Sequence, residues 1–427
     1  MSTDTVPHRL LAHGREHGHR FAYSERIDGK WVPTTYGQYV DQVQTVARAF
    51  ISMGLEPGQR ICVLGYNRPE WVIADVAAMC VGAAPAGIYT TCSPEEVQYI
   101  AHHAEAPIVV VEDHAQWEKI RAVREQLPHL KRVVLMKGQD PVDDALVWTW
   151  DQLIGAGTKT YQAQLDTRLD TLGGDEVATL IYTSGTTGPP KAVMLTHDNL
   201  SFVADAGSAM IGMGPDDKCV SYLPLSHIAE QMISIHGAIT AGAQIFFAES
   251  MERLPDNLKE VQPTIVFGVP RVWEKIYDKV AARLSEAKGM KRVLVEFAMK
   301  AARELHTAQN DGRTPSTAVQ LRFRLAERLI FKKLKPLLGL GNARLCVSGA
   351  APISTEVIDF FMGLDLMIHE IYGQSEDCGP TTFNFPGRTR IGTVGVPVPG
   401  VDVTIAEDGE ICVRGPNVFK GYLKDPD

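Results

Sequence analysis

Hydrophobic residues occur in the first part of the chain as short runs separated by longer helical patterns. Four such runs lie at Arg60–Gly65, Ile108–Glu112, Arg132–Met136 and Val177–Thr183. Short β-branched runs bounded by turn residues predict buried strands. Further runs of this kind lie at Lys218–Leu223, Gln244–Phe247, Thr264–Gly268 and Arg344–Ser348. Because strands that alternate with helices are typical of parallel sheets, we predict an α/β fold.

The most apolar stretch of the chain is Val72–Tyr89. Its length approaches that of a membrane span, but it contains Asp75, Gly82, Pro85 and Gly87. Because these residues do not suit a continuous apolar helix, we predict a buried helix that runs into a buried strand instead of a membrane helix.

The pattern changes near Thr389, where short alternating runs and turns at Pro397–Gly400 and Glu407–Gly409 begin. This pattern predicts a small β-rich, barrel-like subdomain. We therefore expect a first layered α/β subdomain over residues 1–200, a second over 201–385, and the β-rich subdomain over 386–427. Both α/β subdomains are expected to contain largely parallel sheets.

Composition restricts the class of protein. A chain of 427 residues with 45% hydrophobic and 22% charged residues is typical of a multidomain globular protein. A net charge of −9 argues against a general nucleic-acid partner. The first residues lack the apolar segment of a secretory signal, and the seven cysteines form no C-x-x-C pair. We therefore expect a cytoplasmic protein without a disulfide framework or zinc site.

The segment Arg283–Arg344 carries an unusual excess of positive charge. It contains 14 Lys and Arg residues and 5 acids, so its net charge is +9 and that of the remaining chain is −18. Two helical patterns fill it, with a break at Asn310–Pro315. One interpretation is a pair of solvated helix faces. The other is attraction to anionic lipid headgroups or an anionic ligand, which would make the protein peripheral to a membrane.

The strongest chemical signal is the loop Tyr182–Lys191. It follows a predicted strand, precedes the helix-like segment Asp198–Met210, and contains two glycines, four hydroxyl residues and one lysine. Glycine lets backbone N–H groups approach an anion, and the lysine can neutralise phosphate charge. The glycine spacing is not that of a Walker A loop, and a plain surface turn is the alternative. The residues expected to contact phosphate are Thr183, Ser184, Gly185, Thr186, Thr187, Gly188 and Lys191.

This loop resembles the phosphate-binding signature of the adenylate-forming superfamily, which includes acyl-CoA synthetases, luciferases and peptide-synthetase adenylation domains. Other segments resemble further motifs of that superfamily in the same order: Ser221–Gln231, Gly268–Trp273, Ser348–Pro352, Tyr372–Glu376 and Gly409–Tyr422. The resemblance covers nearly the whole chain from about Asn67. It is strongest to long-chain, bubblegum-type acyl-CoA synthetases.

The resemblance implies a two-step reaction. A long-chain fatty acid attacks the α-phosphorus of ATP to form an acyl-adenylate and pyrophosphate, and coenzyme A then displaces AMP. The catalytic positions implied are Thr183, Lys191, Glu376 and His227, of which Thr183 and Glu376 match the Mg²⁺ positions. Considered alone, Glu376 fits a surface charge and His227 a structural histidine.

The resemblance also implies the nucleotide and acyl sites. The nucleotide positions beyond the loop are Gly349, Ala350, Ala351, Glu370, Ile371, Tyr372, Gly373 and Ser375, with Tyr372 offering a face for adenine. His227, Val269 and Trp273 match the substrate region, and Trp273 resembles a gate over the acyl tunnel. Its apolar neighbours in the sequence equally suit a core aromatic. No aspartate lies in His227–Gln231, which favours an uncharged acyl tail over an amino acid.

The sequence differs from the superfamily pattern in lacking the Thr-Gly-Asp motif that holds the ribose hydroxyls. We therefore expect the large N-terminal domain of a long-chain fatty acid–CoA ligase without the small C-terminal domain, and impaired thioester formation. The alternatives are a fatty acyl-AMP ligase that delivers to a carrier protein, and a catalytically silent nucleotide- or fatty-acid-binding module. The resemblance is also compatible with a homodimer.

Overall fold

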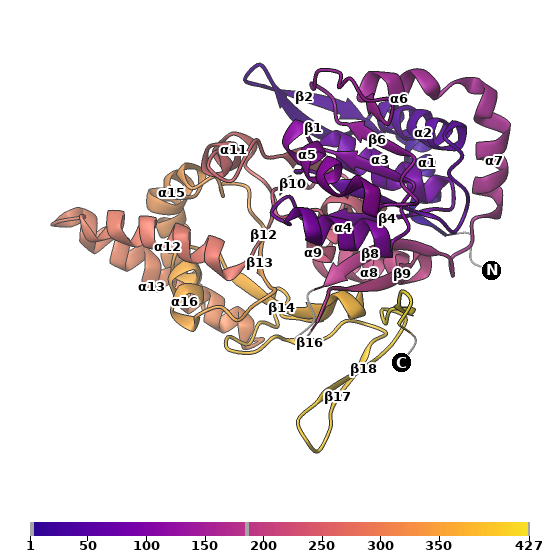
Figure 1. Cartoon of the computed structure of the whole chain (residues 1–427). Helices are drawn as coiled ribbons and strands as arrows, with labels where there is room; N and C mark the ends of the chain where they lie inside the picture. The colour runs from indigo at the N-terminus through magenta and orange to yellow at the C-terminus, as the bar shows by residue number, and fades with distance from the viewer. Residues whose placement is uncertain (1–3, 184–187, 426–427) are drawn as a thin grey trace. The chain divides into compact units, whose positions relative to one another are not determined.

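The computed structural model describes residues 4–183 and 188–425, and its chain divides into two compact units (Figure 1). The first unit comprises Met1–Asp205, Ser221–Phe247 and Pro416–Asp427. The second comprises Ala206–Val220 and Ala248–Gly415. Each unit therefore draws on segments that are distant in the sequence.

An eight-stranded sheet is the framework of the first unit, in the order β19-β9-β8-β4-β3-β5-β6-β7. The strands are β3 (Arg60–Leu64), β4 (Ala84–Ile88), β5 (Ile108–Val111), β6 (Arg132–Leu135), β7 (Val147–Thr149), β8 (Val177–Thr183), β9 (Lys191–Thr196) and β19 (Gly421–Tyr422). The six strands from β8 to β7 are parallel, whereas β9 and β19 pair antiparallel. The predicted strands and the parallel α/β sheet are confirmed.

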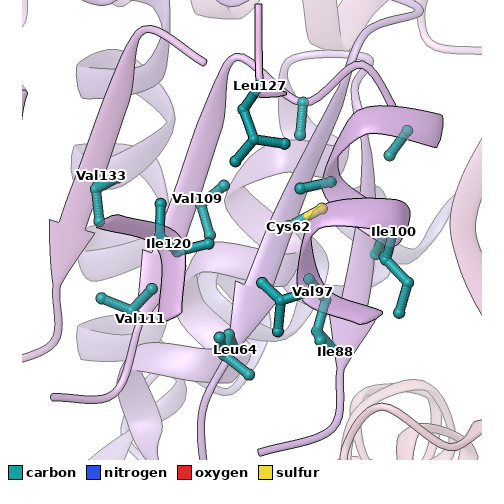
Figure 2. Close-up of a cluster of buried hydrophobic side chains, with 14 of the residues drawn as sticks. Cys62, Leu64, Ile88, Val97, Ile100, Val109, Val111, Ile120, Leu127 and Val133 are labelled. Carbon is teal, nitrogen blue, oxygen red and sulfur yellow. The ribbon is translucent and has the colours of Figure 1, made fainter. Parts of the chain in front are cut away.

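Helices cover this sheet because their apolar residues pack against its β-branched strands. Figure 2 shows Val97 and Ile100 of α4 (Pro94–His103) and Ile120 of α5 (His114–Val123) packed over Cys62 and Val109 of the sheet. Burial of such side chains stabilises the fold by about 1.5–3 kcal/mol each.

The apolar stretch that includes Val72–Tyr89 forms α3 (Pro69–Cys80) and β4, as predicted. Every residue of α3 is buried. Among the residues that the structure describes, no helix is both long enough and apolar enough to cross a membrane.

The remaining elements of the first unit surround this sheet. They are α1 (Val6–Glu16), β1 (Phe21–Ile27), β2 (Lys30–Thr35), α2 (Tyr36–Ser52), α6 (Trp150–Ala156), α7 (Gln162–Thr171), α8 (His197–Ile211), α9 (Ile228–Gln231), the π-helical segment η3 (Met232–Gly237), α10 (Ala238–Ala241) and β11 (Gln244–Phe247). Strand β1 pairs with β2 antiparallel and with β11 parallel. Helix α8 continues past Asp205 into the second unit, and β10 (Lys218–Ser221) returns to the first.

The second unit is built on the sheet β12-β13-β14-β15-β16. Its strands are β12 (Ile265–Gly268), β13 (Leu345–Ser348), β14 (Ile368–Gln374), β15 (Gly379–Phe383) and β16 (Val396–Pro397). Its helices are α11 (Leu254–Val261), α12 (Pro270–Ser285), α13 (Met290–Asn310), α14 (Thr317–Ala326), the π-helical segment η4 (Glu327–Phe331), α15 (Lys332–Leu337) and α16 (Thr355–Gly363). Strands β12, β13 and β14 are parallel, and β15 and β16 are antiparallel additions.

The tail over residues 386–427, which we expected to form a barrel-like subdomain, has its strands in three separate sheets. Strand β16 pairs with β15, β17 (Asp402–Ile405) pairs with β18 (Ile411–Arg414), and β19 pairs with β9. The described residues of this tail form no closed barrel, because its strands have only two to four residues: β16 and β19 extend sheets made by other segments, and β17 and β18 form a separate two-stranded sheet.

Candidate active site

The loop with the strongest phosphate signal joins two antiparallel strands. Strand β8 ends at Thr183, β9 begins at Lys191, and the two residues are direct partners across the ladder. Gly188 has φ +100°, which favours glycine. The predicted phosphate contacts Ser184, Gly185, Thr186 and Thr187 lie outside the described residues.

The helix predicted at Asp198–Met210 is confirmed as α8, but a strand that was not predicted lies between it and the loop. Residues 191–196 form β9, and α8 begins only at His197. The run from Lys191 to Thr196 is mostly buried and pairs with β8 over its whole length, so its backbone groups are satisfied as a strand. The N-terminus of α8 is therefore separated from the loop by the whole of β9.

Two loops of the first unit lie at the carboxyl ends of parallel strands, and a third segment approaches the strand between them. Thr183 ends β8, and Asn67 follows β3. Gly87 in β4 permits close approach of the segment that carries His227, because a Cβ at this glycine would lie 2.6 Å from Cα of Ser226. Ligands of open α/β sheets bind outside the carboxyl ends of the strands. The sheet therefore gathers two predicted site residues, Thr183 and His227, at its binding edge.

His227 caps the short helix α9. Its Nδ1 accepts a hydrogen bond from the backbone N–H of Ala229 at 3.1 Å. Burial lowers the pKa of His227, so the imidazole is neutral near pH 7. With Nδ1 acting as the acceptor, the ring proton resides on Nε2, which can donate to an oxygen.

A buried carboxylate beside His227 was not among the predicted site residues. Glu230 accepts hydrogen bonds from the hydroxyls of Ser221 and Ser234, both at 2.6 Å, and from the backbone N–H of Leu223 at 3.3 Å. Asn67 Nδ2 lies 3.4 Å from the same carboxylate. Burial raises the pKa of Glu230 to about 7. The only signal in the sequence was its place within the Ser221–Gln231 motif.

The second unit also places motif residues side by side on its parallel strands. Gly268, Ser348 and Glu370 are neighbours across β12, β13 and β14. Ser348 Oγ and Glu370 Oε2 are buried and have no hydrogen-bond partner in the described chain. Burial raises the pKa of Glu370. Buried polar atoms of this kind are costly unless a ligand or water satisfies them.

Small residues follow Ser348 for a steric reason. A Cβ on Gly349 would lie 2.5 Å from Cγ2 of Ile371. Ala350 has φ +69°, a conformation that costs energy for a residue other than glycine and is common at functional sites. Residues 349–351 thus form a tight turn beside Glu370 and Ile371, which brings five of the predicted nucleotide positions together: Gly349, Ala350, Ala351, Glu370 and Ile371.

Strand β14 then turns into the segment that carries Glu376. The register shifts between Tyr372 and Gly373, and a Cβ on Gly373 would lie 1.7 Å from the carbonyl oxygen of Gly379. Ser375 is buried and Glu376 is half-buried in the short 3-10 turn η5 (Ser375–Asp377). Burial raises the pKa of Tyr372.

Trp273 lies in the core of the second unit. Its side chain is 1% exposed, its Nε1 donates to the carbonyl oxygen of Val347 at 3.1 Å, and its ring contacts Phe361 edge-on at 5.4 Å. Val269 is the N-cap residue of α12, one turn before Trp273. This packing is that of the core aromatic named above as the alternative, and the gate over an acyl tunnel stays a prediction.

The two residues predicted to hold Mg²⁺ belong to different units, Thr183 to the first and Glu376 to the second. A hydroxyl and a carboxylate are oxygen donors of the kind that Mg²⁺ prefers, and this ion usually keeps several waters and phosphate oxygens. Each residue taken singly is therefore chemically suited to this ion, and their joint site stays a prediction. Among the described residues, no group of three or more His, Cys, Asp and Glu side chains could hold a metal by itself.

The predicted site residues thus lie on loops and strands of an α/β protein with largely parallel sheets, and comparison with known families gives the class. Residues 11–423 match the family described as AMP-binding enzyme, and the chain belongs to that family. The chain is 37% identical over 421 residues to long-chain-fatty-acid–CoA ligase ACSBG2 of Gallus gallus, covering 96% of this chain and 55% of that protein. It is 36% identical over 434 residues to ACSBG1 of Homo sapiens, covering 98% of this chain and 59% of that protein.

Solved structures agree with the fold. A long-chain-fatty-acid–CoA ligase (FadD1) from Archaeoglobus fulgidus matches with a TM-score of 0.73 at 21% identity, covering 99% of this chain and 77% of that chain. The anthranilate CoA ligase AuaEII in complex with anthranoyl-AMP matches with a TM-score of 0.76 at 18% identity, covering 100% of this chain and 73% of that chain. The present chain spans between half and two-thirds of the length of its curated relatives.

Proposed function

We propose that this chain activates long-chain fatty acids with ATP, as the nucleotide- and acyl-binding part of a fatty acid–CoA ligase. The observation that supports this most is the row Gly268, Ser348 and Glu370 across three parallel strands, where Ser348 Oγ and Glu370 Oε2 are buried and lack hydrogen-bond partners among the described residues. Family membership and the similarity to long-chain-fatty-acid–CoA ligases support the same reaction.

In the first step, a carboxylate oxygen of the fatty acid forms a bond to the α-phosphorus of ATP. The bond from that phosphorus to the bridging oxygen breaks, and pyrophosphate leaves. Lys191 and the loop from Thr183 neutralise and orient the phosphates, while neutral His227 donates from Nε2 to the reacting carboxylate. Mg²⁺, held by Thr183 and Glu376, would supply charge neutralisation between the two anions.

In this proposal the nucleotide base and the acyl chain bind to the second unit. The turn 349–351 and the face of Tyr372 bind adenine, with Gly373 and Ser375 completing that wall. The acyl tail lies beside Val269 and Trp273. In the second step the sulfur of coenzyme A attacks the acyl carbonyl carbon, and AMP leaves.

Exchange of labelled pyrophosphate into ATP tests the first step. The chain is incubated with ATP, Mg²⁺, labelled pyrophosphate and palmitate. In the matched control, the free amino acid alanine replaces palmitate as the carboxylate substrate. Exchange that depends on palmitate supports the proposal. ATP binding without exchange would instead favour a silent nucleotide-binding module.

The acceptor is tested separately by supplying acyl-AMP with either coenzyme A or a carrier protein that bears a phosphopantetheine thiol. Thioester formed on coenzyme A supports the ligase. Thioester formed only on the carrier protein would favour an acyl-AMP ligase.

A further inference from the structure

Helix α14 and the segment η4 that continues it expose a row of leucines, although their opposite side is already packed. Leu321, Leu325 and Leu329 are spaced four residues apart and are 68%, 49% and 42% exposed. Side chains with this spacing lie on one face of a helix. We call these three residues the leucine ridge. Its exposure requires an explanation, because contiguous apolar patches on soluble proteins mark interaction sites.

The opposite face of the same segment provides its attachment to the second unit. Ala326 and Phe331 are buried against Ala298, Ala301 and Ala302 of α13, which is labelled in Figure 1. The leucine ridge is therefore not needed to hold α14 in place. It is an additional apolar face on a helix that is already anchored.

Cations without acidic partners lie beside the leucine ridge. Arg324, Arg328, Lys332 and Lys333 are exposed, and none of the four forms an ion pair with a described acid. By contrast, Arg322 pairs with Glu304 at 3.0 Å, and Lys335 pairs with Asp365 at 2.8 Å. The charge beside the ridge is thus available to an external anion, within a segment of net charge +9.

We propose that the face of α14, η4 and α15 that carries the leucine ridge docks on an anionic lipid bilayer. Leucines that enter the boundary between headgroups and acyl chains, flanked by cations at the headgroups, are the two components of interfacial helix binding. A nucleic acid would satisfy the cations and leave the leucines in water. A second copy of this face would bring like charges together across a two-fold contact.

Vesicle sedimentation tests the charge component. The full chain is mixed with vesicles of phosphatidylcholine alone, or with about one-third phosphatidylglycerol. We expect binding only to the anionic vesicles, and weaker binding as salt rises. The combined variant Arg324→Gln, Arg328→Gln, Lys332→Gln and Lys333→Gln should bind at least about 100-fold more weakly, since each cation contributes roughly five-fold.

The apolar component needs its own variant. Leu325→Gln with Leu329→Gln should weaken binding about ten-fold, because two side chains lose contact with the acyl boundary. The matched control replaces two exposed isoleucines of the β17–β18 ribbon, Ile405→Gln and Ile411→Gln, and should bind like the parent chain. A Leu325→Trp variant should shift its fluorescence to the blue when anionic vesicles are added.

The following outcomes would overturn the proposal. One is equal vesicle binding by the parent chain and both the charge and leucine variants. A second is a dimer in sedimentation velocity that the leucine variant abolishes while vesicle binding is unchanged, which would assign the ridge to a second copy. A third is tighter binding to duplex DNA than to anionic vesicles. Circular dichroism of each variant checks that the fold is retained.

Discussion

Lys191, the last residue of the predicted phosphate loop, forms an ion pair with Asp425, which is distant in the sequence: Nζ and Oδ2 are 2.7 Å apart. The same ammonium lies 4.8 Å from the ring centroid of Tyr422. Strand β19 brings these residues together because it pairs with β9, the strand that Lys191 begins. A phosphate bound by Lys191, as predicted, would therefore compete with a carboxylate already in place.

Lys191→Ala should reduce palmitate-dependent pyrophosphate exchange by about 100-fold, equivalent to about 2.7 kcal/mol, because it removes a cation from the transferring phosphates. Lys424→Ala is the matched control, since this lysine is also exposed and pairs with Glu105 at 2.9 Å. Exchange by the Lys191 variant equal to that of the control would remove Lys191 from the site.

Asp425→Asn should strengthen ATP binding by up to about five-fold, because phosphate no longer displaces a carboxylate from Lys191. The side chains of Lys191 and Asp425 are 45% and 39% exposed, so the free energy of unfolding should change by less than about 1 kcal/mol. Titration calorimetry and urea unfolding measure the two quantities. Weaker ATP binding would show that Asp425 assists the nucleotide instead of competing with it.

Glu376→Gln should lower pyrophosphate exchange about 100-fold and raise the Mg²⁺ concentration needed for half-maximal exchange, because the amide is a weaker ligand than the carboxylate. Glu410→Gln, an exposed residue in the turn between β17 and β18, is the control. Unchanged exchange at saturating Mg²⁺ would contradict the assignment of Glu376 as a metal ligand.

Glu230 should make stability depend on pH. Its pKa is raised from 4.5 to about 7 by burial, so between these values the folded state binds more protons than the unfolded state. The free energy of unfolding should therefore fall as pH rises through this window. The Glu230→Gln variant lacks this contribution. The difference in free energy of unfolding, parent chain minus variant, should therefore decrease by about 2 kcal/mol between pH 5 and pH 8.

Urea unfolding of both proteins at the two pH values measures this difference. Glu249→Gln, which alters a more exposed carboxylate that contacts Asn257, is the control. A parallel pH dependence of parent and Glu230 variant would mean that Glu230 is ionised in the fold throughout this range.

Substitutions of Trp273 test whether this residue gates the acyl site or is only a core aromatic. Trp273→Ala should cost about 3–5 kcal/mol of stability, and Trp273→Phe about 1 kcal/mol through the lost hydrogen bond to Val347. If the ring also gates the acyl site, Trp273→Phe should change the preference between octanoate and palmitate in pyrophosphate exchange. Loss of stability with an unchanged preference would leave Trp273 as a core residue alone.

The sequence by itself determined most of the sheet framework. The runs that became β3, β5, β6, β8 and β11 are short, β-branched and bounded by turns, so their local pattern was sufficient. The motif positions at the carboxyl ends of strands followed from the same local order, since Thr183 and Ser348 each end a predicted strand.

The tertiary structure alone decided where strands pair and which polar groups are buried. Strand β9 was not predicted, because Lys191–Thr196 has no turn signal before helix α8 and becomes a strand only by pairing with β8. Likewise, the tail strands β16 and β19 joined two different sheets, while β17 and β18 paired with each other. The burial of Glu230 and the ion pair of Lys191 with Asp425 depend on contacts between distant segments, which no local pattern of hydrophobic and polar residues encodes.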